Sequence, residues 1–132
     1  ACVRDLRAGG AATVPVPGTR ADERGEPTRS LGPSSVVLVE GHLLYNREVL
    51  RDLLDLRLFV DVGVHERVIR RLSRDVENGT QWGRAVAWYR RDVVPNVGPY
   101  SETGRRYADL VIPYEDLNQV VVDTIAAWVR RR

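Results

Sequence analysis

Two short runs of consecutive apolar residues each predict a strand that is buried on both faces. The first is Val36-Val37-Leu38-Val39, followed by Glu40, and the second extends from Leu58 to Val62. Between them, apolar residues recur at helical spacing over residues 48–56. A strand, a helix and a strand in close succession form a βαβ unit, which is typical of a parallel sheet.

The second half of the chain predicts three helices and one more strand. Val68, Ile69, Leu72 and Val76 share one face of a helix over residues 65–78, which Gly79 ends. A second helix is predicted over residues 82–94, where Pro95 ends it, and residues 96–105 are predicted to form a loop. A strand over 108–112 follows, and Asn118 is placed to cap a last helix over 119–131.

The first 35 residues differ in composition from the rest of the chain, because glycine and proline are clustered there. They predict an irregular, exposed arm, with the end of a helix near Leu6 and short edge strands over 12–16 and around 28–31. Residues 36–132 carry the regular elements. We therefore expect the α/β class, a three-layer parallel sheet with flanking helices, in a single domain over 1–132.

The composition excludes several kinds of site. All 20 basic residues are arginine. Without lysine the chain cannot hold a G-x-x-x-x-G-K-[ST] phosphate loop, a Schiff-base lysine or a lysine general base. Methionine is also absent, so we expect a processed product or a piece of a longer protein.

The compartment is expected to be the cytoplasm. The chain has one cysteine, Cys2, which allows no internal disulfide. It has no apolar stretch of about 18 residues, the length that a membrane span needs. We therefore expect a soluble protein without a membrane partner.

Positive charge is concentrated after residue 66. Residues 1–66 hold 8 arginines against 10 acids, whereas residues 67–132 hold 12 against 8. Within the predicted helix over 65–78, four arginines are spaced i, i+3, i+4 and i+7 along one stripe: Arg67, Arg70, Arg71 and Arg74. This stripe is either an ordinary solvated face, with Asp75 and Glu77 as partial partners, or a site for a polyphosphate, which guanidinium groups bind bidentately. RNA is the weakest of the interpretations, because the nearby aromatic residues follow core spacing.

Acidic residues end two of the predicted strands. Glu40 is placed either to organise the water around Mg²⁺ or to form a structural ion pair, and the sequence does not decide between these. For Asp61 the structural interpretation is favoured. Neither His42 nor His65 has a serine, a cysteine or a metal-binding residue at a spacing typical of a catalytic or metal site, so both are interpreted as non-catalytic.

Several segments together resemble the uridine kinase and phosphoribulokinase family of P-loop enzymes. They are Val36 to Gly41, Leu58 to Asp61, Arg70-Arg71-Leu72-Ser73-Arg74-Asp75, Tyr107-Ala108-Asp109-Leu110-Val111-Ile112-Pro113 and Asn118. The resemblance covers about residues 5–130. It implies an ATP- and Mg²⁺-dependent phosphorylation of a nucleoside 5′-hydroxyl by the complete protein.

The resemblance also implies roles for single residues. Arg71 and Arg74 match lid arginines that approach the substrate and phosphates, and Arg67 and Arg70 are grouped with them as a lid site. Glu40 matches the acidic residue after the third strand, with a metal role, and Asp116 and Asn118 lie in the loop beside the adenine. No catalytic residue is assigned. The partners implied are a nucleoside and ATP, with no nucleic acid, and a homo-oligomer is left open.

The chain departs from the family pattern at several positions. The nucleoside-pocket stretch is Pro15-Val16-Pro17-Gly18-Thr19 with Asp22 beyond it, the lid R-G-R is replaced by Asn78-Gly79-Thr80, and Trp88 replaces a glutamine. The family's sheet order, 2-3-1-4-5, would leave this chain with strands 3, 4 and 5 and without the P-loop strand.

Two hypotheses follow from these matches and departures. The first is the lid and carboxyl half of a nucleoside kinase, inactive alone. The second is a degenerate, non-catalytic module that binds a nucleotide or a partner.

Overall fold

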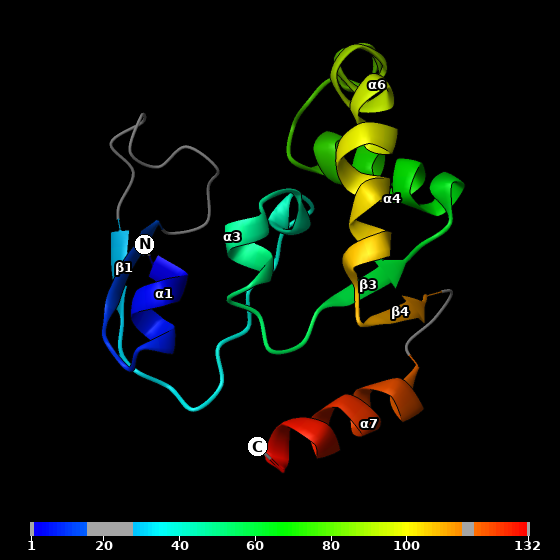
Figure 1. Cartoon of the computed structure of the whole chain (residues 1–132). Coiled ribbons are helices and arrows are strands. Elements are labelled where there is room, and N and C mark those ends of the chain that lie inside the picture. Colours follow the sequence, from blue (N-terminus) through cyan, green and yellow to red (C-terminus); the bar gives the residue numbers. More distant parts are fainter. Residues whose placement is uncertain (1, 16–27, 115–117, 132) are drawn as a thin grey trace. The chain divides into compact units, whose positions relative to one another are not determined.

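The computed structural model describes residues 2–15, 28–114 and 118–131, and these fall into two units, residues 1–40 and 41–132. In the first unit, helix α1 (Cys2–Arg7) precedes the strands β1 (Ala12–Pro15) and β2 (Thr28–Leu31), which pair antiparallel as a small hairpin (Figure 1). Gly9 ends α1 with φ 77°, and the amide of Gly10 donates to the carbonyl of Asp5. Leu6 and Ala12 are buried, so this unit has a small core of its own. The predicted helix end and edge strands are confirmed.

The predicted strand over residues 36–39 does not form. Val36, Val37 and Leu38 are exposed, and Leu38 is 87% exposed. A buried strand needs neighbours on both sides to take its amides and carbonyls, and no strand among the described residues pairs with this run. The expectation of a third parallel strand is therefore wrong for the described structure.

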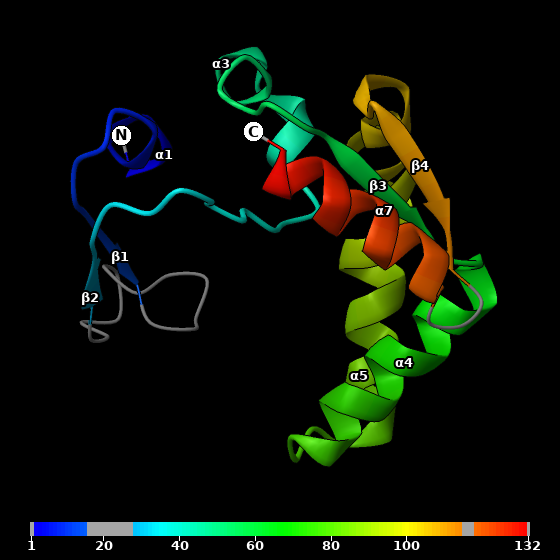
Figure 2. The ribbon, with the colours of Figure 1, turned by 90° about the horizontal axis from the view of Figure 1, so that it is seen from below.

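The second unit is built on two parallel strands, β3 (Leu58–Asp61) and β4 (Leu110–Pro113). Leu58 pairs with Leu110 and Asp61 with Pro113. Figure 2 shows the two strands side by side, seen from below. Ahead of β3 come a short 3₁₀ helix, η1 (Leu44–Asn46), and helix α3 (Glu48–Arg51). The helix predicted over 48–56 is shorter than expected, because after Arg51 the chain tightens into i+3 bonds from Leu53 to Leu50 and from Leu54 to Arg51.

An ion pair fixes the start of these two strands. Arg57 donates through Nε and Nη2 to Asp109, at 3.1 and 2.7 Å, and its backbone amide donates to the same carboxylate at 2.7 Å. The amide of Asp109 in turn donates to the carbonyl of Arg57 at 2.8 Å. These hydrogen bonds hold the pKa of the Asp109 carboxyl below its usual value, with the Arg57 side chain as the main cause.

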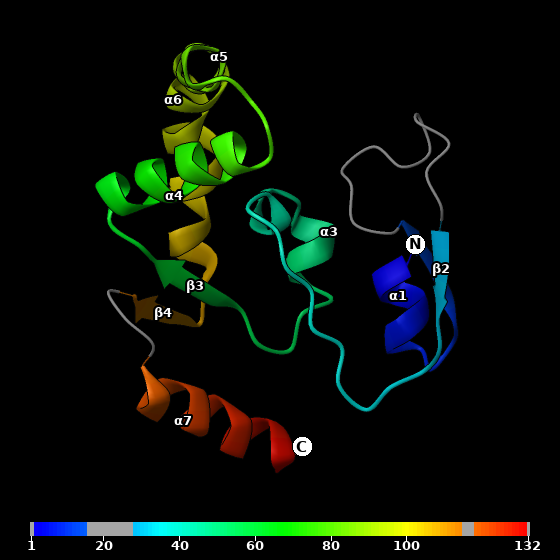
Figure 3. The same ribbon diagram turned by 180° about the vertical axis from the view of Figure 1, so that it is seen from behind.

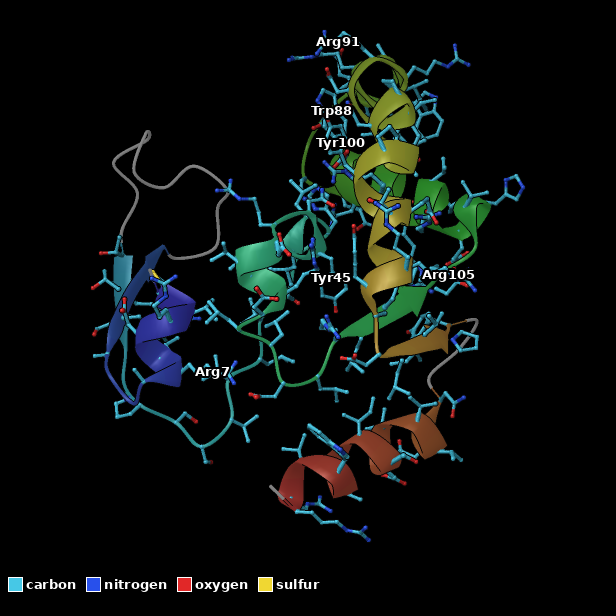
Figure 4. All side chains as sticks on the ribbon, viewed as in Figure 1. Arg7, Tyr45, Trp88, Arg91, Tyr100 and Arg105 are labelled. Atoms are coloured by element: carbon cyan, nitrogen blue, oxygen red, sulfur yellow. The ribbon has the colours of Figure 1, made fainter. Side chains whose placement is uncertain are left out.

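Two tyrosines, Tyr45 and Tyr107, make further contacts in this unit. The hydroxyl of Tyr45, whose pKa is raised by burial, donates to the carbonyl of Leu58 at 2.7 Å. Gly104 is buried beside it, and an added Cβ would lie 3.2 Å from the Tyr45 ring and 3.7 Å from Phe59. Arg51 and Arg106 both lie over the ring of Tyr107. Figure 4 shows Tyr45 between α3 and β3.

Helix α4 (Val64–Glu77) follows β3 and matches its prediction closely. Leu72 is its buried residue, at 8% exposure. Its end is a Schellman motif, in which the amide of Gly79 donates to Val76 and that of Thr80 to Asp75. The positive φ of Gly79, 88°, is the reason that glycine stands there.

The chain then stays helical from residue 82 to 107, which corrects the predicted loop over 96–105. Helix α5 (Trp82–Trp88) passes into a π-helical stretch, η2 (Tyr89–Val93), the short α6 (Val94–Asn96), a second π-helical stretch, η3 (Val97–Ser101), and a 3₁₀ helix, η4 (Glu102–Tyr107). We call these consecutive helical stretches, residues 82–107, the helical column, and Figure 3 shows it from behind. Pro95 does not stop it, because proline lies in the first turn of α6, where its missing N–H is not required.

The last helix, α7 (Gln119–Arg130), begins where predicted. The side-chain oxygen of Asn118 accepts from the amide of Val121 at 3.2 Å, so the predicted cap is confirmed. The half-buried residues of this helix include Val121, Ile125, Trp128 and Val129, whereas Val120 is 75% exposed. Among the described residues, no helix is both long enough and apolar enough to cross a bilayer.

Candidate functional site: the arginine stripe of α4

The four arginines of the predicted lid site do lie on α4, but they differ in what they contact. Nη1 of Arg67 lies 2.7 Å from Oε1 of Glu102 in η4, although the angle falls short of a hydrogen bond. Arg70 donates through Nε to Glu66, one turn earlier, at 2.6 Å, and its guanidinium lies 5.2 Å from the ring of Tyr114. Both guanidinium groups are therefore already paired with carboxylates inside the fold.

Arg71 is held from two sides. Its Nε donates to Asp75 at 3.0 Å, and its guanidinium carbon lies 4.6 Å from the ring centroid of Trp88 in α5. The salt bridge fixes the arginine along the helix, and the indole supports the flat face of the guanidinium. Arg71 is thus positioned, and its two Nη groups make no hydrogen bond to the described residues, so they are left for other acceptors.

Arg74 is the last arginine of the stripe, and its side-chain contacts differ from those of the other three. It is exposed, and in the part of the chain that the structure describes its side chain makes no hydrogen bond or ion pair. It is one of the two predicted phosphate-facing residues. Its guanidinium is available without breaking an internal contact.

A pocket opens where α4 meets α5, which lie next to each other in Figure 2. Its volume is about 310 Å³, and it is lined by Arg71, Asp75, Thr80, Arg84, Ala85 and Trp88. Ala85 is buried, at 1% exposure. With two guanidinium groups and one carboxylate, the wall carries a formal charge of +1.

The sequence did not single out two of these lining residues as functional. Arg84 stood outside the stripe, and Trp88 was interpreted as core because of its helical spacing. Figure 4 shows Trp88 in the helical column, away from Arg105, which lies beside β3. A signal for Arg84 existed in the excess of seven arginines over two acids in residues 67–91, but spacing along one helix cannot reveal a residue on the next.

The other predicted residues are not among those that line this pocket. Glu40 is exposed at the end of the first unit, and its metal role stays a prediction. Asn118 caps α7 with its side-chain oxygen, and Asp116 lies outside the described residues. Asp61 forms an ion pair with Arg105 at 2.7 Å, which agrees with its structural interpretation.

The described ranges contain no group of three or more histidine, cysteine, aspartate or glutamate side chains that could hold a metal ion. Mg²⁺ in phosphoryl-transfer sites is commonly held by one or two carboxylates together with substrate phosphates and water. A single carboxylate such as Glu40 therefore fits only as one part of such a site.

Comparison with known proteins agrees with the resemblance seen in the sequence. A sequence model of the phosphoribulokinase / uridine kinase family matches residues 1–121. The chain is 35% identical over 127 residues to a protein named uridine kinase from Limosilactobacillus reuteri (strain DSM 20016), covering 96% of this chain and 58% of that protein.

A uridine kinase from Streptococcus uberis is 36% identical over 124 residues, which cover 93% of this chain and 59% of that protein. One from Ligilactobacillus salivarius is 35% identical over 108 residues, with 81% and 51% covered. The chain thus spans a little over half the length of these relatives. On this evidence the chain belongs to the phosphoribulokinase / uridine kinase family.

Proposed function

We propose that the chain supplies the lid and carboxyl half of a nucleoside kinase, which transfers a phosphoryl group from ATP to a nucleoside 5′-hydroxyl in the complete protein. The observation that carries the proposal is α4. It folds as a 14-residue helix with Arg71 positioned and Arg74 open, the two residues that match the family's lid arginines. The relatives' name, uridine kinase, makes uridine the first substrate to try.

In this proposal α4 supplies positive charge to phosphate groups and does no covalent chemistry. Phosphoryl transfer depends on positioning and on stabilising charge on the phosphate oxygens. Arg71 suits this task because Asp75 and Trp88 already restrict it, so little side-chain entropy is lost on binding. Bound Mg²⁺ would neutralise charge on the phosphates, with Glu40 as the candidate carboxylate.

The proposal includes inactivity of this chain alone. The chain has no lysine, so it holds no P-loop lysine of its own. A direct assay mixes the chain with uridine, ATP and Mg²⁺ and measures uridine monophosphate. Turnover at an ordinary enzymatic rate would contradict this part of the proposal.

ATP binding to the chain tests the lid assignment. Isothermal titration calorimetry should show weaker ATP binding for Arg71→Gln and for Arg74→Gln, each by about tenfold, since a charge-assisted hydrogen bond is lost. Arg130→Gln, a matched control at the end of α7, should bind ATP as the unchanged chain does. If all three variants bind ATP equally, the lid assignment is wrong.

One observation favours a second candidate, a non-catalytic module that binds a nucleotide or a protein partner. Three of the four stripe arginines are already paired with Glu102, Glu66 and Asp75. The coding sequence upstream separates the candidates, because a G-x-x-x-x-G-K-[ST] loop in the same reading frame supports the kinase and an unrelated sequence supports the module.

A further inference from the structure

The two arginines of the α4–α5 pocket are not equivalent. Arg71 is tied to Asp75 at 3.0 Å and lies over Trp88. Arg84 comes from α5, lines the same pocket and is exposed, and within the described ranges its guanidinium has no hydrogen bond or ion pair. Since Asp75 already balances one charge, the pocket keeps one uncompensated cation.

We propose that this pocket binds the phosphate group of a small phosphorylated molecule, with Arg84 as its main ligand-binding cation. The inference goes beyond the proposed function, because it assigns a residue of α5 that lies outside the lid stripe. It does not depend on whether the complete protein is a kinase.

The donors in the pocket favour phosphate over a carboxylate. Arg84 offers its whole guanidinium fork, Arg71 offers the two Nη groups that Asp75 leaves, and the Thr80 hydroxyl has no hydrogen bond among the described residues. These donors come from three segments: α4, the turn after it and α5. The oxygens of a phosphate group are spread over a tetrahedron and can accept from donors on several sides, whereas the two oxygens of a carboxylate accept within one plane.

The size and the wall of the pocket agree with this ligand. A volume of about 310 Å³ is near the lower end of the range for small-molecule sites, which is roughly 300 to 1,000 Å³. Ala85 and the indole of Trp88 form an apolar part of the wall, where the local dielectric constant is lower and charge pairs are stronger. The formal charge of +1 attracts a phosphate monoester, which carries about −1.5 to −2 at pH 7.

The test uses inorganic phosphate as the probe and the full chain labelled with ¹⁵N. Phosphate is titrated at constant ionic strength while the indole N–H signal of Trp88, identified with Trp88→Phe, is followed by NMR. We expect a saturable shift, and we expect Arg84→Gln to weaken phosphate binding by about tenfold or more. Phenyl phosphate should bind at least as tightly as phosphate, and acetate should bind more weakly.

The matched control is Arg90→Gln. Arg90 is an exposed arginine six positions further along the same helical column, it has no partner among the described residues, and it does not line the pocket. It should change the affinity for phosphate less than twofold, and far-UV circular dichroism should show both variants folded.

Equal affinity of Arg84→Gln and the unchanged chain for phosphate, or the absence of a saturable shift, would overturn the site. Acetate binding more tightly than phosphate would overturn the ligand assignment, and failure of phenyl phosphate to bind would overturn the assignment to a phosphorylated molecule.

These outcomes are separate from those of the kinase proposal. Loss of phosphate binding in Arg84→Gln with ATP binding still sensitive to Arg74→Gln would support both. Absence of a P-loop upstream would end the kinase proposal and leave the phosphate site as measured.

Discussion

Arginine has different roles in two regions. One is the start of strands β3 and β4, and the other is the corner between helices α4 and α5, which carries Arg71, Arg74 and Arg84. At the strands, Arg57 is fully engaged by Asp109, which makes three hydrogen bonds to it and joins segments 52 residues apart in the chain. At the corner, Arg71 is half engaged, and Arg74 and Arg84 have no partner in the described part of the chain. The buried residues of α4 and α5 are the apolar Leu72 and Ala85, and the arginines of the corner are available for a ligand.

The largest expected effect tests whether apolar packing holds the corner. Leu72→Ala removes a side chain that is 8% exposed on the inner face of α4. The lost transfer free energy and the cavity left behind should lower the free energy of unfolding by about 2 to 4 kcal/mol. Urea denaturation followed by circular dichroism measures it.

Ile69→Ala is the control for Leu72→Ala. Ile69 is an apolar residue on the same helix but is 60% exposed, so its truncation should cost less than about 1 kcal/mol. Equal costs for the two variants would show that Leu72 does not anchor α4.

The second-largest expected effect concerns the start of strands β3 and β4, where the ion pair between Arg57 and Asp109 stabilises the fold. Asp109→Asn removes the carboxylate that accepts from the amide and the side chain of Arg57. We expect the melting temperature to fall by a few degrees in a thermal scan. Asp92→Asn is the control: Asp92 pairs with its neighbour Arg91 and, among the described residues, its side chain joins no distant segments, so its loss should leave the melting temperature nearly unchanged.

The contrast between the two regions also shows how far local sequence signals reach. Helix α4, its glycine stop and the Asn118 cap of α7 were predicted correctly, because each depends on residues within one or two turns. The strands β3 and β4 were also predicted, from apolar runs that pair with each other in the described fold.

Two elements were predicted wrongly because their state depends on something outside the local pattern. The run over 36–39 has strand composition, but a buried strand also needs neighbours, which the described residues do not provide. Pro95 was interpreted as a helix stop, although it can equally lie in the first turn of the next helix.

The site was predicted in part for the same reason. Helical spacing placed the four arginines on one stripe, as the structure has them. It could not reveal that Glu102 neutralises Arg67 from 35 positions away, or that Arg84 shares a pocket with Arg71. Both are tertiary contacts between different helices.

A smaller effect should appear in the pH dependence of stability. Hydrogen bonds from Arg57 lower the pKa of Asp109 in the folded chain, so the folded state favours the ionised carboxylate. Its contribution is present above the unfolded pKa, about 3.9, and is lost as pH falls through the lower folded value. Urea denaturation between pH 6 and pH 3 should show a steeper loss of stability below pH 4 for the unchanged chain than for Asp109→Asn. Parallel curves would mean that the ion pair is not maintained in solution.

The smallest expected effect on stability belongs to Arg74, the exposed end of the stripe. Because Arg74 has no partner among the described residues, Arg74→Gln should change the free energy of unfolding by less than about 0.5 kcal/mol. It removes a like charge next to Arg70 and Arg71, so any change should be a slight gain at low salt that disappears at high salt. Urea denaturation at two salt concentrations measures this. A clear loss of stability would show that Arg74 stabilises the fold in solution. Arg74 would then resemble Arg57 at the start of the strands and would no longer count as an arginine available for a ligand.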